Sequence, residues 1–273
     1  MVGEWDQWVG GEAAASDLLT QGLIDRFCAT LDLPESGAVA PPGLHWCLAP
    51  GAVPTGQLGG DGHPPKGDLL PPIPLPRRMW AASRLEFLAP LTAGAPIARI
   101  TRVVSASSKE GRSGPLGFVE LEMETRAGGV LAVREAQTLV YRAAGSAMTP
   151  LPGADTPDLS SWDAVHTLTP DEPMLLRFSA LTFNAHRIHY DLPYTREEEL
   201  YPALVVHGPL VASLLLNHAA AAFGPLASAS VRAMAPAFCG QPLHLAASTA
   251  DGGLTLRAIG GDGRTIMEGA ARL

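Results

Sequence analysis

Apolar residues recur with two different periods along the chain, and the periods predict where helices and strands lie. Residues 16–31 place apolar side chains at helical spacing, and Ser16 or Asp17 could cap a helix there. Beyond residue 84 the period shortens to two, and strands are predicted at 98–104, 117–124 and 130–141. Within 117–124 the glutamates share one face and the apolar residues the other, which is typical of an antiparallel strand with one solvated side.

The second half of the chain is organised around one very apolar segment. Residues 209–223 are apolar nearly all round the predicted helix, which indicates burial on most sides, and a proline suits its first turn. A short strand at 164–168 precedes this helix. Further strands are predicted after it, at 229–233, 242–250, 254–260 and 264–271.

Two segments rich in proline and glycine interrupt these patterns. Residues 143–162 are predicted to be a linker between two units. Residues 34–76 form a loop long enough to be unusual in a compact protein, and such loops are commonly functional or face a ligand. A buried helix wrapped by an antiparallel sheet is the hot-dog arrangement, and both halves end in a run of strands. We therefore predict an α+β protein with two hot-dog units packed side by side, over 1–143 and 160–273.

Composition narrows the functional classes. The chain is 47% hydrophobic and 17% charged, enough for a substantial core, and its formal net charge of −8 argues against non-specific binding to nucleic acid. Its three cysteines are widely spaced and form no CxxC pair, so neither a disulfide framework nor a zinc knuckle is predicted. The N-terminus has no signal-peptide pattern and the apolar stretch 204–223 is interrupted by polar residues, so we expect a cytoplasmic protein that does not span a membrane.

Side chains suited to proton transfer gather directly before the apolar helix. His186, His189 and His207 lie there, together with Asn184 and Asp191. Imidazole exchanges protons near neutral pH, so this cluster predicts acid/base chemistry beside a hydrophobic core. The same three histidines could supply zinc ligands, but their spacing is not distinctive, and no metal is predicted.

The motif FNAHRIHYD at 183–191, followed by VVHGPL at 205–210, resembles the MaoC-like hydratase/dehydratase superfamily. The first half is similar to the N-terminal unit of its double hot-dog branch, which includes type 2 hydroxyacyl-thioester dehydratases and the mesaconyl-CoA and itaconyl-CoA hydratases. That similarity lies in DGHPPKGDLLPPIPLPRRMWAASRLEFLAPLTAG, KEGRSGPLGFVELEMET and REAQTLVYRA. The resemblance spans roughly residues 4–273 and implies a coenzyme A thioester as substrate, no other cofactor and a homo-oligomer.

One position departs from the family pattern. The family carries an Asp, an Asn two residues later and a His five residues after the Asp. With His189 in register, Asn184 stands at the position of the Asp and His186 at that of the Asn. The resemblance implies that His189 is the acid/base group, and His186 could share that role or orient a water. Asn184 could hold a water or a carbonyl, and Asp191 is expected to cap a helix or orient a neighbour, with a direct catalytic role less favoured.

Substrate binding is expected from the helix start and from basic residues. The backbone N–H of Gly208 opens the helix, where its dipole favours a developing oxyanion. Arg187 is placed to bind a second carboxylate of the substrate. Coenzyme A and the acyl group would also be contacted by His207, if it does not simply pack at the turn, and by Arg77, Arg78, Lys109 and Arg112.

These expectations favour an acyl-CoA hydratase/dehydratase that converts itaconyl-CoA or mesaconyl-CoA to citramalyl-CoA. A dehydratase of fatty 3-hydroxyacyl thioesters keeps the reaction and changes the substrate. A hot-dog thioesterase is disfavoured because residues 210–223 contain no Asp or Glu. A non-catalytic acyl-CoA binding module is the remaining alternative, because Asn184 has replaced a carboxylate.

Overall fold

The computed structural model describes residues 4–35, 37–111, 114–155 and 157–273. Its N-terminal half supplies the strands β1 (Glu12–Leu18), β2 (Arg77–Phe87), β3 (Pro96–Gly111), β4 (Gly114–Ala127) and β5 (Val130–Arg142). Its C-terminal half supplies β6 (Ala164–Leu168), β7 (Ser228–Ala233), β8 (Leu243–Ala250), β9 (Gly253–Gly260) and β10 (Thr265–Arg272). Among the described residues these strands form one sheet in the order β1-β3-β4-β5-β2-β7-β10-β9-β8-β6, and every pairing is antiparallel.

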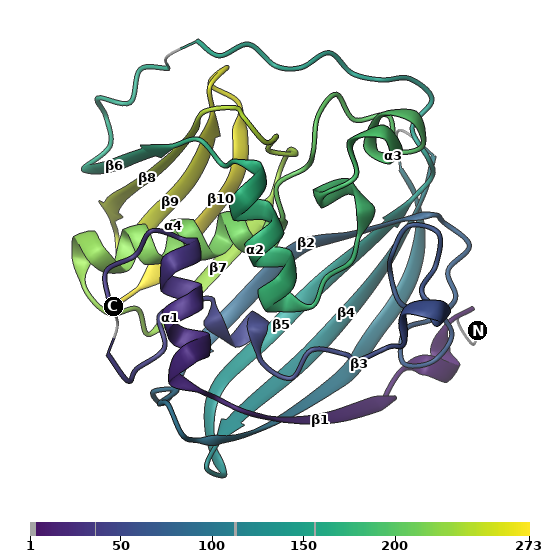
Figure 1. Cartoon of the computed structure of the whole chain (residues 1–273), viewed down its shortest axis with the longest axis horizontal. Helices are drawn as coiled ribbons and strands as arrows, with labels where there is room; N and C mark the ends of the chain where they lie inside the picture. Colours follow the sequence, from purple (N-terminus) through teal and green to yellow (C-terminus); the bar gives the residue numbers. More distant parts are fainter. Residues whose placement is uncertain (1–3, 36, 112–113, 156) are drawn as a thin grey trace.

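The pairing of β2 with β7 joins the two halves into that single sheet. It runs from Ala82 opposite Arg232 to Glu86 opposite Ser228. Figure 1 shows the two halves side by side, with the helices gathered on one side of the curved sheet. The α-helices are α1 (Gln21–Thr30), α2 (Glu172–Thr182), α3 (Leu192–Glu197) and α4 (Gly208–Phe223). Short 3₁₀ turns add η1 (Asp6–Trp8), η2 (Leu44–Cys47), η3 (Thr55–Gln57) and η4 (Arg187–His189).

One hydrophobic core runs through both halves. It contains Ile24 and Phe27 of α1, Leu85 of β2, and Leu210 and Leu215 of α4, each at most 1% exposed. The α4 helix lies against the C-terminal strands, as expected for a helix that is apolar nearly all round. A long antiparallel sheet wrapped around buried helices in two halves confirms the predicted double hot-dog fold.

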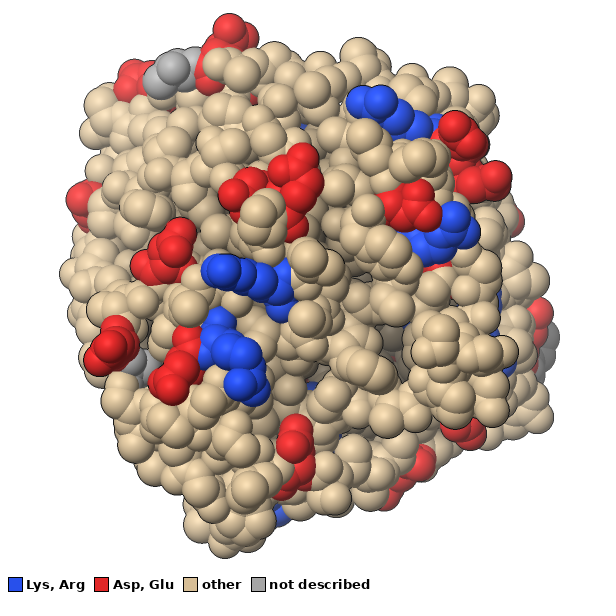
Figure 2. All heavy atoms as spheres, viewed as in Figure 1, with Lys and Arg blue, Asp and Glu red and all other residues tan. Residues whose placement is uncertain are grey.

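The strand predictions are confirmed, since each predicted range overlaps an observed strand almost completely. The solvated face of β4 is also confirmed, because Val119, Leu121 and Met123 are buried on its other side. The described residues of the predicted linker, 143–162, contain no helix or strand. Figure 2 shows acidic and basic side chains interspersed over one face of the molecule, without a broad field of one sign. Among the described residues, every helix is too short or too polar to cross a membrane.

The helix predicted at 16–31 is only partly correct. Residues 12–18 form β1, which pairs with β3, and the helix begins at Gln21. Thr20 is its cap, because its hydroxyl accepts a hydrogen bond of 3.1 Å from Leu23 N. The Asp17 carboxylate instead accepts hydrogen bonds from Leu18 N and Ala49 N. Pairing with β3 satisfies the backbone groups of residues 12–18, and this gain outweighs a local helical pattern.

The helix α2 was not predicted from the sequence. The Asp171 carboxylate caps its start by accepting a hydrogen bond of 2.9 Å from Met174 N. The helix ends at Phe183, which adopts a left-handed conformation with φ of 51°. That turn directs the following residues, 184–191, away from the α2 axis and toward the start of α4, so α2 positions the histidine segment.

Candidate active site

A cleft of about 450 Å³ lies between the two halves of the sheet, at the start of α4. Strands β2, β5, β7 and β10, the segment that follows α2 and the start of α4 all contribute to its walls. Of the residues predicted from the sequence, the structure brings seven to this cleft: Arg77, Arg78, Asn184, His186, His189, His207 and Gly208. His63 also lines it, although sequence reasoning did not select it.

His189 is fixed with one ring nitrogen free to face the cleft. Its Nδ1 donates a hydrogen bond of 2.7 Å to the carbonyl oxygen of Val205. A carbonyl can only accept, so Nδ1 carries the proton, and Nε2 of the neutral ring is left as an acceptor. Burial lowers the pKa of His189 to about 4. The imidazole is therefore neutral at physiological pH and can accept a hydrogen bond or a proton.

His207 and Gly208 lie directly beside His189, at the start of α4. His207 is 1% exposed, and its Nε2 shares a hydrogen bond of 2.8 Å with the Ser179 hydroxyl. Burial lowers the pKa of His207 well below its ordinary value. Gly208 lies so close to the Trp80 ring that an added Cβ would be 2.7 Å from Cε3. In the first turn of a helix the backbone N–H groups have no partner within the helix, so the Gly208 N–H can donate to a ligand.

Asn184 and His186 share a tight turn on the rim of the cleft. The Asn184 side-chain oxygen accepts a hydrogen bond of 2.9 Å from the backbone N–H of His186. That bond occupies the oxygen of the amide and leaves the NH₂ group as a donor. The His186 ring stands edge-on to His189, with ring centroids 5.5 Å apart. Burial, and then the neighbouring His63, lower the pKa of His186 to about 2.

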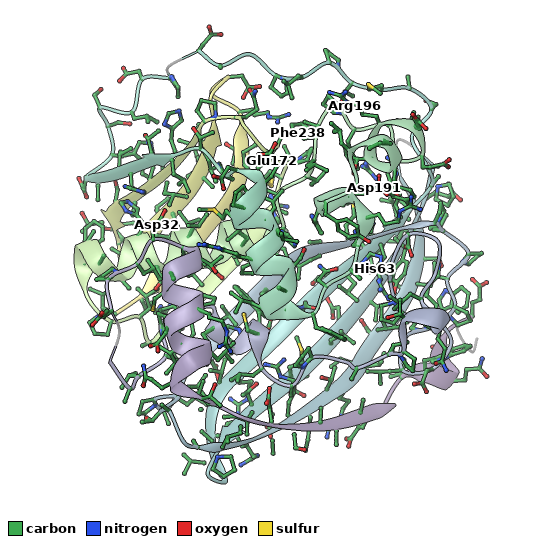
Figure 3. All side chains as sticks on the ribbon, viewed as in Figure 1. Asp32, His63, Glu172, Asp191, Arg196 and Phe238 are labelled. Atoms are coloured by element: carbon green, nitrogen blue, oxygen red, sulfur yellow. The ribbon has the colours of Figure 1, made fainter. Side chains whose placement is uncertain are left out.

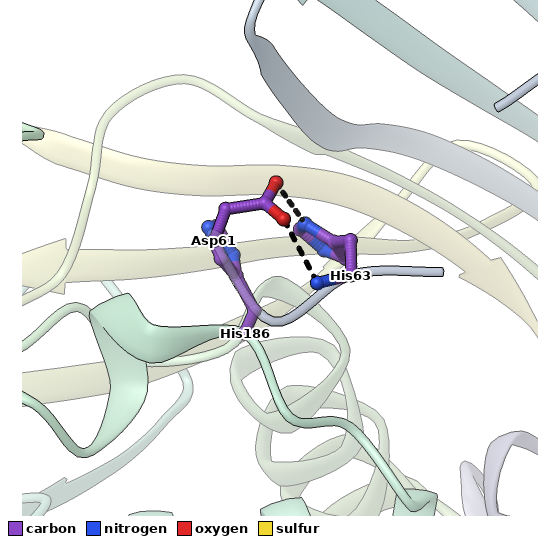
Figure 4. A group of neighbouring side chains, drawn as sticks. All are labelled: Asp61, His63 and His186. Carbon is purple, nitrogen blue, oxygen red and sulfur yellow. Dashed lines mark hydrogen bonds and ion pairs between the residues drawn. The ribbon is translucent and has the colours of Figure 1, made fainter. Parts of the chain in front are cut away.

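A loop from the N-terminal half brings two further side chains to this turn. His63 lies beside His186 with ring centroids 3.9 Å apart, and its Nδ1 donates a hydrogen bond of 3.0 Å to Asp61 Oδ2. Figure 3 places His63 beside the segment that follows α2, and Figure 4 shows the group at close range. The sequence pointed to these two residues only through the unusual length of the loop at 34–76, which predicted that the loop is functional. It did not identify a residue, because the sequence does not say where a loop folds back.

The electrostatics of this pair follow from burial and from the shared proton. Burial raises the pKa of Asp61, but the hydrogen bonds from the His63 ring and backbone outweigh it and hold that pKa well below its usual range. Burial lowers the pKa of His63, and the hydrogen bond to Asp61 opposes that effect. At neutral pH the pair is therefore a carboxylate bonded to a neutral imidazole whose Nε2 is an acceptor.

Among the described residues, Asp61, His63 and His186 form the group with the spacing of a metal site. One ligand atom from each lies within 4.8 Å of the others. Both oxygens of Asp61 already accept hydrogen bonds, from His63 N at 2.9 Å and from His63 Nδ1 at 3.0 Å. In the structure the carboxylate and His63 thus form a hydrogen-bonded pair. The three histidines considered from the sequence are not this group.

Arginines line one end of the cleft. Arg77 is buried, pairs with Glu199 at 2.6 Å and lies 5.1 Å over the Tyr201 ring. Arg78 and Arg142 also line the cleft. Within the described part of the chain, no carboxylate lies within ion-pair distance of either. This end of the cleft therefore carries positive charge that is free to meet an anionic ligand.

The remaining predicted site residues lie elsewhere. Arg187 does not line the cleft: its guanidinium pairs with Asp191 at 2.8 Å and stacks 4.2 Å over the Tyr194 ring. Asp191 caps α3 by accepting a hydrogen bond of 3.1 Å from Tyr194 N, and Figure 3 labels it next to that helix. Asp191 thus caps a helix and holds a neighbouring side chain, the roles that the sequence favoured for it, and Arg187 is engaged by Asp191 away from the cleft.

Lys109, near the end of β3, also lies away from the cleft. Lys109 is exposed and lies 5.3 Å over the Phe118 ring. Arg112 lies outside the described residues. Lys109 is not among the described residues that line the cleft.

Comparisons with known proteins point to one family. The sequence profile of the hydroxyacyl-thioester dehydratase type 2 family matches residues 43–239. The mesaconyl-C(4)-CoA hydratase of Chloroflexus aurantiacus is 40% identical over 277 residues, which cover 99% of this chain and 98% of that protein. The mitochondrial hydroxyacyl-thioester dehydratase type 2 of Schizosaccharomyces pombe is 28% identical over 88% of this chain and 91% of that protein.

Solved structures show the same fold at low sequence identity. HtdX of Mycobacterium tuberculosis superposes with a TM-score of 0.68 and 16% identity, over 96% of this chain and 99% of that one. A MaoC-like dehydratase from Phytophthora capsici gives a TM-score of 0.70 and 16% identity, over 96% of this chain and 95% of that one. At this identity the likeness supports the double hot-dog fold alone.

Proposed function

Because the chain belongs to the hydroxyacyl-thioester dehydratase type 2 family and is accordingly a hydro-lyase, we propose that it adds water reversibly to a dicarboxylic enoyl-CoA. The substrate would be itaconyl-CoA or mesaconyl-CoA, and the product citramalyl-CoA. The observation that carries this proposal is the placing of the His189 ring and the Gly208 N–H in one cleft with Arg78 and Arg142, which have no carboxylate partner among the described residues. The relative that is 40% identical is named for a mesaconyl-CoA thioester.

Hydration of a conjugated thioester requires an acceptor for the water and a donor for the thioester oxygen. His189 Nε2 is a neutral acceptor that can take a hydrogen bond or a proton from the attacking water. The Gly208 N–H can donate to the carbonyl oxygen as negative charge develops there. The absence of a side chain at Gly208 lets the thioester approach this N–H closely, next to the Trp80 ring.

The arginines support a substrate with a second carboxylate. Arg78 lines the cleft and is close enough to His63 and His186 to influence their pKa values, so it lies near the proposed reaction centre. A guanidinium can bind a carboxylate through two parallel hydrogen bonds. We therefore transfer to Arg78 the role that was expected of Arg187. Coenzyme A phosphates could instead meet Arg142, which lies on the neighbouring strand at the same end of the cleft.

A second candidate is the dehydration of fatty 3-hydroxyacyl thioesters. The family description and the relative from S. pombe favour it, and part of the cleft wall is apolar. That part includes Met79, Trp80, Leu139, Phe178 and Met234. An apolar wall would accept an alkyl chain, whereas such a substrate would offer no carboxylate to Arg78.

A substrate panel tests the proposal. The purified full chain is incubated with itaconyl-, mesaconyl-, crotonyl- and a longer enoyl-CoA, the absorbance of the conjugated thioester is followed, and products are identified by mass. We expect kcat/KM for itaconyl- or mesaconyl-CoA to exceed that for crotonyl-CoA by about tenfold or more. Faster turnover of the longer enoyl-CoA would support the second candidate. Release of free thiol would indicate a thioesterase, and calorimetric binding without turnover a binding module.

A further inference from the structure

The geometry points to a second catalytic group that is contributed by the N-terminal half. We propose that the Asp61–His63 pair replaces the carboxylate that Asn184 lacks, and that His63 takes the proton of the attacking water. The inference rests on the proposed function, because it assigns a step of that reaction. The FNAHRIHYD segment supplies no carboxylate to the cleft instead, since its one carboxylate, Asp191, caps α3 outside the cleft.

The pair has the arrangement of an oriented base. Asp61 stands behind His63, outside the cleft lining, and fixes the ring through Nδ1. The bond to a carboxylate makes Nδ1 the protonated nitrogen, so the free nitrogen of a ring that lines the cleft is Nε2. A carboxylate next to the ring also stabilises the imidazolium that forms when Nε2 takes a proton. Asp61 is thus a positioning residue and His63 the catalytic one.

The chain holds this loop firmly against the histidine segment. The backbone N–H of Arg187 donates a hydrogen bond of 2.9 Å to Asp61 O, and Arg187 Nη1 donates one of 2.9 Å to Gly60 O. Asp191 in turn holds the Arg187 guanidinium. At Gly62, φ is +87°, and an added Cβ would be 1.8 Å from the Ala185 carbonyl oxygen. The segment after α2 therefore fixes the position of the Asp61–His63 pair as well as supplying His186 and His189.

The proposed step balances without any further reactant. His63 Nε2 takes one proton from water while the water oxygen bonds to the β-carbon. The electron pair of the double bond moves toward the α-carbon and the thioester oxygen, where the Gly208 N–H donates. The imidazolium of His63 then returns the proton to the α-carbon. His189 Nε2 accepts a hydrogen bond from the other hydrogen of the water, and both imidazoles end neutral.

The test compares His63→Gln, Asp61→Asn and a control, His166→Gln, in the full chain. His166 is exposed on β6 and does not line the cleft, so it reports on the loss of a histidine alone. We expect His63→Gln to lower kcat about 10²- to 10⁴-fold with little change in KM, the usual range for an acid/base group. His63→Ala should recover part of its activity when imidazole is added, whereas a purely structural residue would not be rescued in this way.

The Asp61→Asn variant tests the role of Asp61 through the pH dependence of kcat. The groups that face His63 are Asp61, His186, Arg78 and Glu199. Removing the Asp61 charge lowers the pKa of His63 further, so the acid limb of kcat should move to lower pH. His63→Gln should remove that limb. Both changes are measured on protein whose thermal unfolding matches that of the control.

Each outcome bears on a different proposal. If the unaltered chain hydrates none of the enoyl-CoAs, the proposed function fails. If the unaltered chain is active and His63→Gln keeps its kcat and its pH profile, the role of His63 is overturned. Stoichiometric zinc in the active chain that disappears in His63→Gln would also overturn it, because the group would then be a metal site.

Discussion

His189 and His207 stack face to face, with ring centroids 3.6 Å apart and ring planes 19° from parallel. A ring nitrogen of each is held by a hydrogen bond, that of His189 to the Val205 carbonyl and that of His207 to the Ser179 hydroxyl. Burial lowers the pKa of both imidazoles, and the neighbouring His189 lowers that of His207 further. The start of α4 is therefore a neutral site that offers acceptors to water and a backbone donor to a thioester.

Replacing His189 should remove the acceptor for water while leaving the cleft in place. We expect His189→Gln to lower kcat by about 10²-fold or more, because the glutamine side chain does not reproduce the ring geometry that places an acceptor at the attacking water. The His166→Gln variant, which keeps the cleft intact, should retain its rate. Steady-state kinetics with itaconyl-CoA measure both, and a His189→Gln chain with an unchanged kcat would remove His189 from the mechanism.

Stability should fall as the pH is lowered below 6.5. Burial lowers the pKa of His189 to about 4 and that of His186 to about 2, from an ordinary value of 6.5. The unfolded chain takes up protons at 6.5 and the folded chain only at much lower pH, so the stabilisation is complete above 6.5. It is lost as pH falls toward 4, by up to about 1.4 kcal/mol for each such histidine and each pH unit.

Urea unfolding at about pH 7.5 and about pH 5 measures this effect through the free energy of unfolding. The double substitution His186→Asn and His189→Asn should reduce the difference between the two conditions. An unfolding midpoint that stays constant or rises toward pH 5 would contradict the protonation states described for the cleft.

Much of the fold follows from patterns that are local in sequence. The apolar helix α4 and the strands β3 to β10 are visible in the periodicity, because each has one face or its whole surface buried. The β1 strand is not, because its pairing with β3 is a long-range contact that local spacing does not report. Local spacing did not predict α2 either, because its cap at Asp171 and its left-handed end at Phe183 are identified only from the structure.

The candidate site divides in the same way. His186, His189 and Gly208 were predictable because they lie in one segment that resembles a known motif. His63 and Asp61 were not, because their approach to His186 depends on how a long irregular loop folds back. Arg187 was assigned to substrate on charge and proximity in sequence, and the structure shows that a neighbouring carboxylate already binds it.

The contact between Gly208 and Trp80 predicts that no side chain larger than hydrogen fits at position 208 without moving the Trp80 ring. An alanine at 208 would place Cβ 2.7 Å from the ring, and Trp46 packs edge-on against Trp80 at 6.1 Å, which hinders its retreat. We expect Gly208→Ala to cost about 1–3 kcal/mol of stability and to lower kcat by about tenfold or more. Gly56→Ala, where an added Cβ meets nothing within 4 Å, is the control. Equal unfolding and equal kcat in the two variants would show that the contact is unimportant.

Gly62 should be needed to hold the N-terminal loop on the histidine segment. Alanine there would clash with the Ala185 carbonyl and would strain a backbone with φ of +87°. We expect Gly62→Ala to displace His63 and to lower kcat about as much as His63→Gln does. At Gly60 an added Cβ meets nothing within 4 Å, so Gly60→Ala should be nearly neutral. Kinetics and thermal unfolding of the pair test this, and a fully active Gly62→Ala chain would contradict it.

Arg78 should decide whether a second carboxylate on the substrate helps or hinders turnover. It lines the cleft without a carboxylate partner among the described residues. An acyl group with its own carboxylate would form an ion pair with its guanidinium. We expect Arg78→Met to lower kcat/KM for itaconyl-CoA by about 10²-fold and to change kcat/KM for crotonyl-CoA much less, because only the first substrate loses an ion pair.

Arg84→Met is the matched control for this comparison. Arg84 lies on the same strand, β2, and does not line this cleft. Its replacement should leave the ratio of kcat/KM for itaconyl-CoA to kcat/KM for crotonyl-CoA unchanged. Equal losses for both substrates in Arg78→Met would mean that Arg78 contacts the coenzyme A part, which the two thioesters share. A faster reaction with crotonyl-CoA than with itaconyl-CoA in the unaltered chain would remove the basis for the comparison and favour the fatty acyl substrate.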